Sequence, residues 1–260
     1  MRENKIRKIW AEGGKVINGW LAIPSSISAE LMAKQGWDSI CIDMQHGAID
    51  YSDALPMLQA ISTTDTTPLV RVPWFDPAII GKSLDAGAYG IICPMVNTRA
   101  EAQAFVAACR YAPQGLRSVG PLRASLYAGA DYVKHANTTI ITMAMIESAD
   151  AVKNVEDILT TPGLDSIYVG PSDLAVSMGE DAGFDPRFPK VFEAIRHVGA
   201  MAKKHKIPAG IHVGSVQYGI EMMETGYSFI SYLSDFRMLQ TIAAKGLAAL
   251  RAGKPDAAVP

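Results

Sequence analysis

The chain has 260 residues, of which 49% are hydrophobic and 19% are charged, and its formal net charge is −2 at pH 7. These values describe a globular protein with a large core, and the length suits one domain that spans residues 1–260. A net charge so close to zero provides no bulk attraction for nucleic acid or for an anionic membrane, so we expect neither as a partner.

The N-terminal residues and the cysteines indicate a cytoplasmic setting. The first ten residues are charged and lack the apolar core of a signal peptide. No apolar run approaches the roughly 18 residues that a membrane-spanning helix needs. Cys41, Cys93 and Cys109 are too few for a disulfide framework, and Cys41 and Cys93 fall inside apolar segments, where a thiol acts as a small hydrophobe. We therefore expect a reducing compartment.

Strand-like and helix-like segments alternate along the whole chain. β-branched and apolar runs predict strands at Val16–Ile23, Ser39–Asp43, Leu69–Val72, Gly90–Cys93, Ile140–Ile146, Ser166–Val169, Ala209–Val213 and Ser228–Leu233. Amphipathic runs with start or stop signals predict helices at Ser26–Gln35, Ser52–Ile61, Pro77–Ala86, Arg99–Arg110, Ala149–Leu159, Phe188–Lys204, Val216–Glu224 and Phe236–Leu250.

Eight strands that alternate with eight helices predict an α/β protein with a closed (β/α)₈ TIM barrel as its single domain. A doubly wound open sheet is the main alternative. No Gly-rich dinucleotide fingerprint follows the first strand, which weakens that alternative. In a barrel the chemistry lies at the carboxyl ends of the strands, so polar residues at those ends are the candidates for a site.

Two carboxylates end consecutive strands. The run Ile140–Ile146 ends at Glu147, and the strand Ser166–Val169 is followed by Gly170-Pro-Ser-Asp173 before a helix that begins near Leu174. Asp173 taken alone is most simply a helix cap. If the two strands are neighbours in a parallel sheet, about 4.8 Å apart, both carboxylates point at one spot. They would repel there without a cation or proton, and Mg²⁺ fits such a pair best.

Other strand ends carry a histidine and an arginine. His46 follows Asp43-Met-Gln and can act as a base near neutral pH, although a loop histidine satisfied by the backbone is a frequent alternative. Arg71 ends the run Leu-Val-Arg-Val and needs counter-charges. Glu147, Asp173 and an anionic substrate could supply them, or Arg71 could form a structural ion pair with Asp43.

Several further features bear on the chemistry. Lysines fall in or beside helices, and none ends a strand, which argues against a Schiff-base enzyme; no Ser or Cys nucleophile signature is present either. The long connection from Tyr111 to Asn137 contains Arg123 and has the length of a lid or an interface arm, unless it is a surface excursion. His212 could be a core-edge histidine, but its place at a strand end makes it a candidate wall of the pocket.

With these pieces the sequence resembles the HpcH/HpaI family of class II, metal-dependent pyruvate aldolases, from about Gly19 to Gly246. The matching motifs stand in the family's order and spacing. They are Asp43-Met-Gln-His46-Gly, Leu69-Val-Arg71-Val-Pro, Leu84-Asp85-Ala-Gly-Ala, Pro94-Met95-Val, Met145-Ile-Glu147-Ser and Gly170-Pro-Ser-Asp173-Leu.

The resemblance implies a role for each matching residue. Glu147 and Asp173 correspond to the metal ligands, with Mg²⁺, Mn²⁺ or Co²⁺ as the cofactor. Arg71 corresponds to the residue that stabilises an enolate oxygen, His46 to the general base and Asp85 to the carboxylate that raises its basicity. The backbone of Gly170, Pro171, Ser172 and Asp173 corresponds to the site for the pyruvate carboxylate.

Two positions depart from the family pattern. Met145 stands where several members have Gln, and His212 stands where a small apolar residue is expected. Both departures indicate an unusual aldehyde side of the pocket, and we expect Trp20, Arg123 and His212 to influence which aldehyde is accepted.

The implied activity is reversible retro-aldol cleavage of 4-hydroxy-2-oxo acids to pyruvate, or a similar 2-oxo acid, and an aldehyde. An acyl-CoA lyase, an oxaloacetate decarboxylase and a non-catalytic barrel subunit are the alternatives. The family's assembly implies a homo-oligomer, a hexamer or a trimer. Asp85 falls in the last turn of its helix, well below the rim, so we expect it to approach His46 of a neighbouring subunit. The alternatives are that Asp85 pairs with Lys82 at the surface, or that Asp43 takes the histidine instead.

Overall fold

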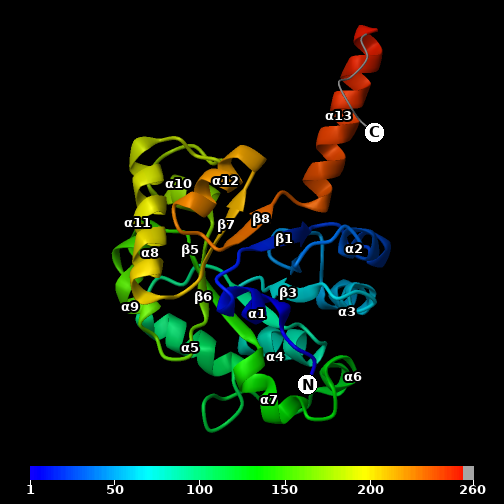
Figure 1. Ribbon diagram of the computed structural model, residues 1–260, viewed down its shortest axis with the longest axis vertical. Helices are drawn as coiled ribbons and strands as arrows, with labels where there is room; N and C mark the ends of the chain where they lie inside the picture. The colour runs from blue at the N-terminus through cyan, green and yellow to red at the C-terminus, as the bar shows by residue number, and fades with distance from the viewer. Residues whose placement is uncertain (254–260) are drawn as a thin grey trace.

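Eight parallel strands form a closed barrel in the computed structural model, which describes residues 1–253 (Figure 1). Each strand pairs with its neighbours in sequence, and β1 also pairs with β8, which closes the ring and excludes an open sheet. The strands are β1 (Val16–Leu21), β2 (Ser39–Asp43), β3 (Thr67–Arg71), β4 (Gly90–Cys93), β5 (Ile141–Ile146), β6 (Ser166–Val169), β7 (Ala209–Val213) and β8 (Phe229–Tyr232). The TIM barrel predicted from the alternation of elements is confirmed.

The predicted helices are present, with small differences at their ends. They are α2 (Ser26–Ala33), α3 (Tyr51–Ile61), α4 (Pro77–Asp85), α5 (Arg99–Cys109), α11 (Pro189–His205), α12 (Val216–Glu224) and α13 (Asp235–Ala252). One predicted helix is interrupted at Asn154, which separates α8 (Ala149–Lys153) from α9 (Val155–Leu159). Four helices were not predicted with these bounds, namely α1 (Lys5–Ala11), α6 (Leu122–Ala128), α7 (Tyr132–Thr139) and α10 (Pro171–Ser177).

Apolar side chains form two separate clusters, one outside and one inside the ring of strands. The larger cluster lies between the strands and the surrounding helices. The smaller one contains residues of the barrel lumen, among them Trp20, Leu69, Met145, Tyr168 and Phe229. Because alternate residues of a barrel strand point inward, the lumen is packed solid, as in other TIM barrels, and leaves space only above it.

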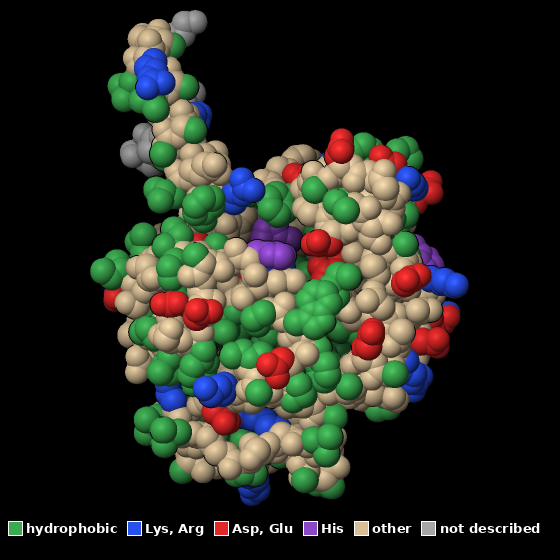
Figure 2. Space-filling model, turned by 180° about the vertical axis from the view of Figure 1, so that it is seen from behind, with side chains coloured by type: hydrophobic (Ala, Val, Ile, Leu, Met, Phe, Trp, Pro, Cys, Tyr) green, Lys and Arg blue, Asp and Glu red, His purple; other side chains and the backbone are tan. Residues whose placement is uncertain are grey.

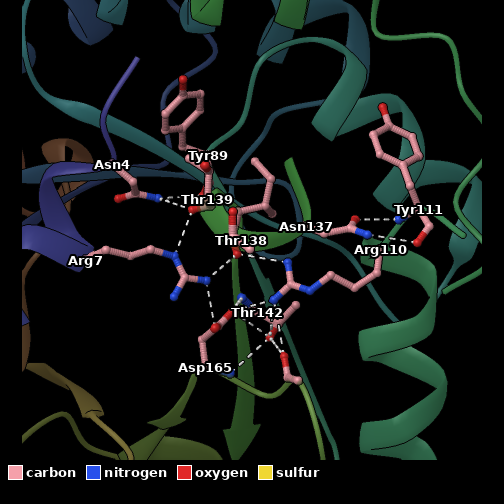
Figure 3. A network of polar contacts seen from close by, with 12 residues as sticks. Asn4, Arg7, Tyr89, Arg110, Tyr111, Asn137, Thr138, Thr139, Thr142 and Asp165 are labelled. Atoms are coloured by element: carbon pink, nitrogen blue, oxygen red, sulfur yellow. Dashed lines mark hydrogen bonds and ion pairs between the residues drawn. The ribbon is translucent and has the colours of Figure 1, made fainter. Parts of the chain in front are cut away.

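A polar network seals the amino-terminal end of the barrel (Figure 3). Arg7 of α1 donates from Nη2 to Asp165 Oδ1 at 2.7 Å, and Arg110 Nη2 donates to Asp165 Oδ2 at 2.6 Å. Arg7 and Arg110 also both donate to the carbonyl oxygen of Ile140. These bonds fix α1 under the lumen, far from the carboxyl ends of the strands, so their role is to hold the barrel together.

Helix α13 packs on the barrel only near its start. Figure 1 shows the helix projecting away from the ring of strands. Its first turn is fixed because Asp235 accepts hydrogen bonds from the backbone N–H of Ala22 and from the Ser28 hydroxyl. Beyond this turn large apolar side chains are exposed, including Leu239, Ile242 and Leu250. Within the described residues, no helix is long and apolar enough to span a bilayer.

All three cysteines are enclosed by the packing around the barrel. Cys41 and Cys93 are fully buried and Cys109 is 1% exposed. Burial raises the pKa of each thiol, that of Cys109 to about 12. The thiols therefore act as apolar packing groups, as the apolar runs around Cys41 and Cys93 predict for those two.

Candidate active site

The carboxyl ends of the strands surround a cavity of about 480 Å³. Figure 2 shows histidine side chains at the centre of a hollow below the base of the projecting helix, with acidic side chains beside them. The cavity is lined by Trp20, Ala22, Asp43, His46, Arg71, Met145, Tyr168, Gly170, Pro171, Ser172, Asp173, Phe184, His212, Ser234, Phe236 and Arg237. Candidate site residues from six different strand ends thus line the same cavity.

Asp43, at the end of β2, organises one side of the cavity. Its carboxylate accepts from Arg71 twice, with Nε to Oδ1 at 2.8 Å and Nη2 to Oδ2 at 2.6 Å. Trp20 Nε1 donates to Oδ2, and the backbone N–H groups of Gln45 and His46 donate to Oδ1. One buried carboxylate therefore fixes the arginine, the tryptophan and the start of the histidine loop.

The ion pair between Asp43 and Arg71 has the bidentate geometry of a strong charge-assisted interaction. Burial opposes both charges, but the hydrogen bonds with Arg71 bring the pKa of Asp43 below its ordinary value, and those with Asp43 raise the pKa of Arg71. The Arg71 guanidinium also lies 4.9 Å from the centre of the Trp20 ring. The counter-charge of Arg71 is therefore Asp43, the structural alternative, although Arg71 still faces the cavity.

Glu147 lies at the end of β5 and is 2% exposed. Its Oε1 accepts the backbone N–H of Met95 at 2.7 Å, a donor that Met95 presents from a left-handed conformation with φ of 53°. Burial raises the pKa of Glu147 to about 7, the Met95 hydrogen bond opposes this shift, and the charge of Asp173 adds to it. A Cβ at residue 170 would overlap Glu147 Oε2, so a larger residue there would displace this carboxylate.

The donor set fits a magnesium-like ion rather than a fully protein-bound metal. Register pairs β5 with β6 along Met143 to Ile146, so the chain segments after both strands emerge side by side. The buried Glu147 carboxylate has no cationic hydrogen-bond partner within residues 1–253, and Asp173 is exposed to the cavity. No group of three or more His, Cys, Asp or Glu side chains that could hold a metal occurs in that range. Two carboxylates with water and substrate oxygens are a common ligand set for Mg²⁺.

His46 is exposed at the edge of the cavity. Its backbone is fixed by Asp43, but its imidazole makes no hydrogen bond within the described part of the chain. The ring therefore meets the cavity without a partner from the described part of its own chain.

Met145 and His212 line the cavity, as their strand-end positions predict. Met145 is almost fully buried, next to Gly170. His212 lies between the rings of Trp20 and Phe184, with centroid distances of 5.1 and 5.0 Å.

Three predicted site residues do not line the cavity of their own chain: the buried Glu147 lies behind Gly170, and Arg123 and Asp85 lie on the outside of the barrel. Arg123 donates to the carbonyl oxygens of Ala86 and Leu58 and to the Ser62 hydroxyl, so it ties the ends of α3 and α4 together. Asp85, at the end of α4, pairs with Arg117 at 2.7 Å and lines a different cavity between α4 and α5. The expected proximity of Arg123 to the aldehyde is not seen, because α6 packs against α4 on the outside of the barrel.

The structure adds residues that sequence reasoning missed. Asp43 was considered only as an alternative partner of Arg71 or of His46, and its place at the end of β2 was the signal that could have revealed its central position. Phe184 and Arg237 line the cavity from a loop and from the first turn of α13. Nothing in the local sequence indicates that either residue reaches the barrel mouth.

A TIM barrel with a buried arginine, an exposed histidine and paired carboxylates at the strand ends has the layout of a barrel enzyme. Residues 18–236 match the family model described as HpcH/HpaI aldolase/citrate lyase. The chain therefore belongs to this family, and by homology it is a carbon–carbon lyase of the class II pyruvate aldolase type.

Individual relatives agree with this assignment. The chain is 42% identical to the hydroxypyruvate/pyruvate aldolase of Rhizorhabdus wittichii, over 96% of this chain and 99% of the relative. It is 35% identical to the 5-keto-4-deoxy-D-glucarate aldolase of Escherichia coli, over 93% and 94%. Its fold matches a HpcH/HpaI family protein from Burkholderia cenocepacia J2315 with a TM-score of 0.89 and 32% identity, over 95% and 99% of the two chains.

Proposed function

We propose that this chain catalyses the reversible cleavage of 4-hydroxy-2-oxo acids to pyruvate, or a similar 2-oxo acid, and an aldehyde. The observation that carries the proposal is the convergence of Arg71, His46 and Asp173 on one cavity. The buried Glu147 lies behind Gly170 of the cavity wall, within reach of the charges of Asp173 and Arg71. The hydroxypyruvate/pyruvate aldolase and the 5-keto-4-deoxy-D-glucarate aldolase support it, since both match almost the whole chain.

Glu147 and Asp173 are the residues that would hold a divalent cation, Mg²⁺, Mn²⁺ or Co²⁺. Such an ion would act as a Lewis acid toward the keto group of the substrate. The raised pKa of Glu147 supports this role, because a buried carboxylate beside a second one is stabilised by an added positive charge.

Arg71 would stabilise the negative charge that develops when the bond between C3 and C4 breaks. Its guanidinium is permanently charged, and Asp43 and Trp20 hold it in place before the reaction. A preorganised charge of this kind avoids reorganisation during the reaction, which is the main source of electrostatic catalysis.

His46 would remove the proton from the C4 hydroxyl in the cleavage direction and return it in the synthesis direction. Its imidazole has no other hydrogen-bond partner within residues 1–253, so the ring nitrogen is available. The backbone from Gly170 to Asp173, at the start of α10, would bind the carboxylate of the 2-oxo acid.

The activity can be tested with an aldehyde panel. Purified protein is incubated with pyruvate, individual aldehydes and Mg²⁺, Mn²⁺ or Co²⁺, and aldol products are identified by mass. A metal-dependent product that disappears in the Glu147→Gln variant is the expected result. Absence of product with every pair, or full activity after exhaustive chelation, would contradict the proposal.

We also propose that the active form is a homo-oligomer in which Asp85 of one chain approaches His46 of another. Asp85 is partly exposed on the outer surface and makes no contact with His46 of its own chain within the described residues. Exposed apolar side chains along α13 support assembly, because an unpartnered apolar face is stabilised by burial.

Subunit mixing tests this arrangement. His46→Ala and Asp85→Ala subunits, each inactive alone, are dissociated and reassembled together. Partial return of activity is expected, since some interfaces then pair an intact His46 with an intact Asp85. Verified mixed oligomers without any recovery would rule out the shared site.

A further inference from the structure

His212 presents an uncharged imidazole to the cavity. Burial lowers the pKa of His212 to about 3, and the neighbouring Arg71 charge acts in the same direction. The ring is therefore neutral under physiological conditions, and its two nitrogens are distinct: one carries a proton and the other accepts. Which nitrogen carries the proton depends on the hydrogen bonds around the ring.

A chain of hydrogen bonds in the barrel lumen determines this tautomer. Asn18 Oδ1 accepts from Ser39 Oγ at 2.7 Å, which leaves Asn18 Nδ2 to donate to Ser231 Oγ at 2.9 Å. Because an amide NH₂ can only donate, the Ser231 hydroxyl keeps its own proton. Burial raises the pKa of Tyr168 and Ser231 opposes this shift, as a donor that faces the phenol oxygen does.

Tyr168 then completes the chain. Its hydroxyl lies 3.3 Å from His212 Nδ1, and because the Ser231 donor faces the other side of the phenol oxygen, the Tyr168 proton points at Nδ1. His212 Nδ1 is therefore the acceptor, and the imidazole proton is on Nε2. Asn18, Ser231 and Tyr168 are at most 1% exposed, so water does not interrupt the relay.

Nε2 is the free end of this relay. It has no hydrogen-bond partner within residues 1–253 and is not sealed away from solvent, and His212 lines the cavity. Its neighbours Trp20 and Phe184 are aromatic and compete poorly for a substrate oxygen. An uncharged N–H donor in this aromatic wall can bind the neutral oxygen of a hydroxyl group. A carboxylate binds more strongly to the charged guanidinium of Arg71.

We propose that His212, through its Nε2–H, is a specificity-determining residue that recognises a hydroxyl group next to the reacting carbonyl. This inference rests on the proposed aldolase function and narrows its substrate class to hydroxylated partners. A substrate without the hydroxyl leaves the donor unpaired against aromatic rings, which penalises binding. The hydroxyl can belong to the 2-oxo acid, as in hydroxypyruvate, or to the aldehyde, as in glycolaldehyde.

The test measures two ratios of kcat/KM in wild type and in His212→Phe. The first compares hydroxypyruvate with pyruvate at a fixed aldehyde, and the second compares glycolaldehyde with acetaldehyde at fixed pyruvate. One ratio should fall on the order of tenfold in His212→Phe, as expected for the loss of one neutral hydrogen bond. The arm that changes identifies which substrate carries the recognised hydroxyl. A ratio is used because it is insensitive to a general loss of activity.

Three further variants separate recognition from packing. His212→Asn keeps an N–H donor and should retain part of the preference. Tyr168→Phe removes the proton that holds Nδ1 as acceptor, so both tautomers become populated and the ratio should fall by less than in His212→Phe. Phe184→Leu changes the apolar wall beside the same ring but keeps the His212 donor, so it should lower the ratio by less than His212→Phe does.

The outcomes distinguish this inference from the proposed function. If His212→Phe makes aldol product with both ratios unchanged, the inference is overturned and the aldolase function stands. If His212→Phe does not fold, unchanged ratios in His212→Asn and Tyr168→Phe together would overturn it equally. If wild type makes no aldol product from any pair, both are overturned.

Discussion

The carboxylate of Asp43 provides the sharpest test of how the site is built. Replacing Asp43 by Asn keeps its size but leaves the Arg71 guanidinium without its counter-charge. The new amide also turns an NH₂ group toward donors, because Arg71, Trp20 and two backbone N–H groups all donate to this side chain. We therefore expect Asp43→Asn to lose both stability and activity.

The size of the loss follows from the burial of the pair. The Asp43 and Arg71 side chains are 4% and 10% exposed, so the small value of a surface salt bridge does not apply. Removing one partner of a buried pair typically costs about 3 to 5 kcal/mol, and we expect the free energy of unfolding to fall by that amount. Removing both charges in Asp43→Asn/Arg71→Met should recover part of it, because no unpaired charge then remains.

Denaturant unfolding and proton exchange at the pyruvate methyl group measure the two effects. Since the pKa of Asp43 is lowered in the folded state, its stabilising contribution is complete above the ordinary carboxyl value of 3.8 and is lost only as the pH falls through the lowered pKa. The stability difference between wild type and Asp43→Asn should therefore be constant from about pH 5 to 9. A loss below about 1 kcal/mol, with exchange at the wild-type rate, would refute this reasoning.

Three further predictions concern the metal pair, the base and the interface of α4. In metal-free protein, burial raises the pKa of Glu147 from 4.5 to about 7, so the folded state keeps a proton that the unfolded state releases. Wild type should lose up to about 3 kcal/mol of stability as the pH rises through this range. Glu147→Gln should lack that slope and also the stabilisation by added Mg²⁺, both read from thermal melts; equal slopes would contradict the assignment. His46→Ala should impair aldol cleavage more than proton exchange of pyruvate, and equal losses in the two assays would give His46 another role. Arg123→Ala should lower the free energy of unfolding by about 1 to 2 kcal/mol through its lost hydrogen bonds yet keep the ranking of aldehydes, and a changed ranking would place Arg123 in the pocket.

The sequence predicts the barrel well because its elements are locally encoded. The strands β2, β4, β6 and β7 and the helix α12 have the predicted bounds. Helix α1 was missed because its charged sequence buries only Ile6, and its position depends on Arg7 bonding to the barrel base. The long connection was read as a loop because α6 and α7 are short and gain their support from packing against α4 and each other.

Site residues could be predicted where their role depends on lying at the end of a strand. Contacts that depend on how two neighbouring strands are aligned were harder to predict. His46, Arg71, Glu147 and Asp173 were all placed on the rim from their positions in the chain. The pairing of Asp43 with Arg71 follows from the register of β2 against β3, which sets these two residues side by side. Sequence patterns indicate which residues form a strand but not how two strands are aligned. The counter-charge of Arg71 could therefore not be chosen from the sequence alone.

The burial of all three thiols makes the native chain inert toward alkylating reagents, because the thiolate is the reactive form and its pKa is raised at each position. A single cysteine introduced on α13, for instance Leu247→Cys, would therefore be labelled selectively in the folded protein. A fluorophore attached there would report whether this helix is covered or free as the protein concentration is varied.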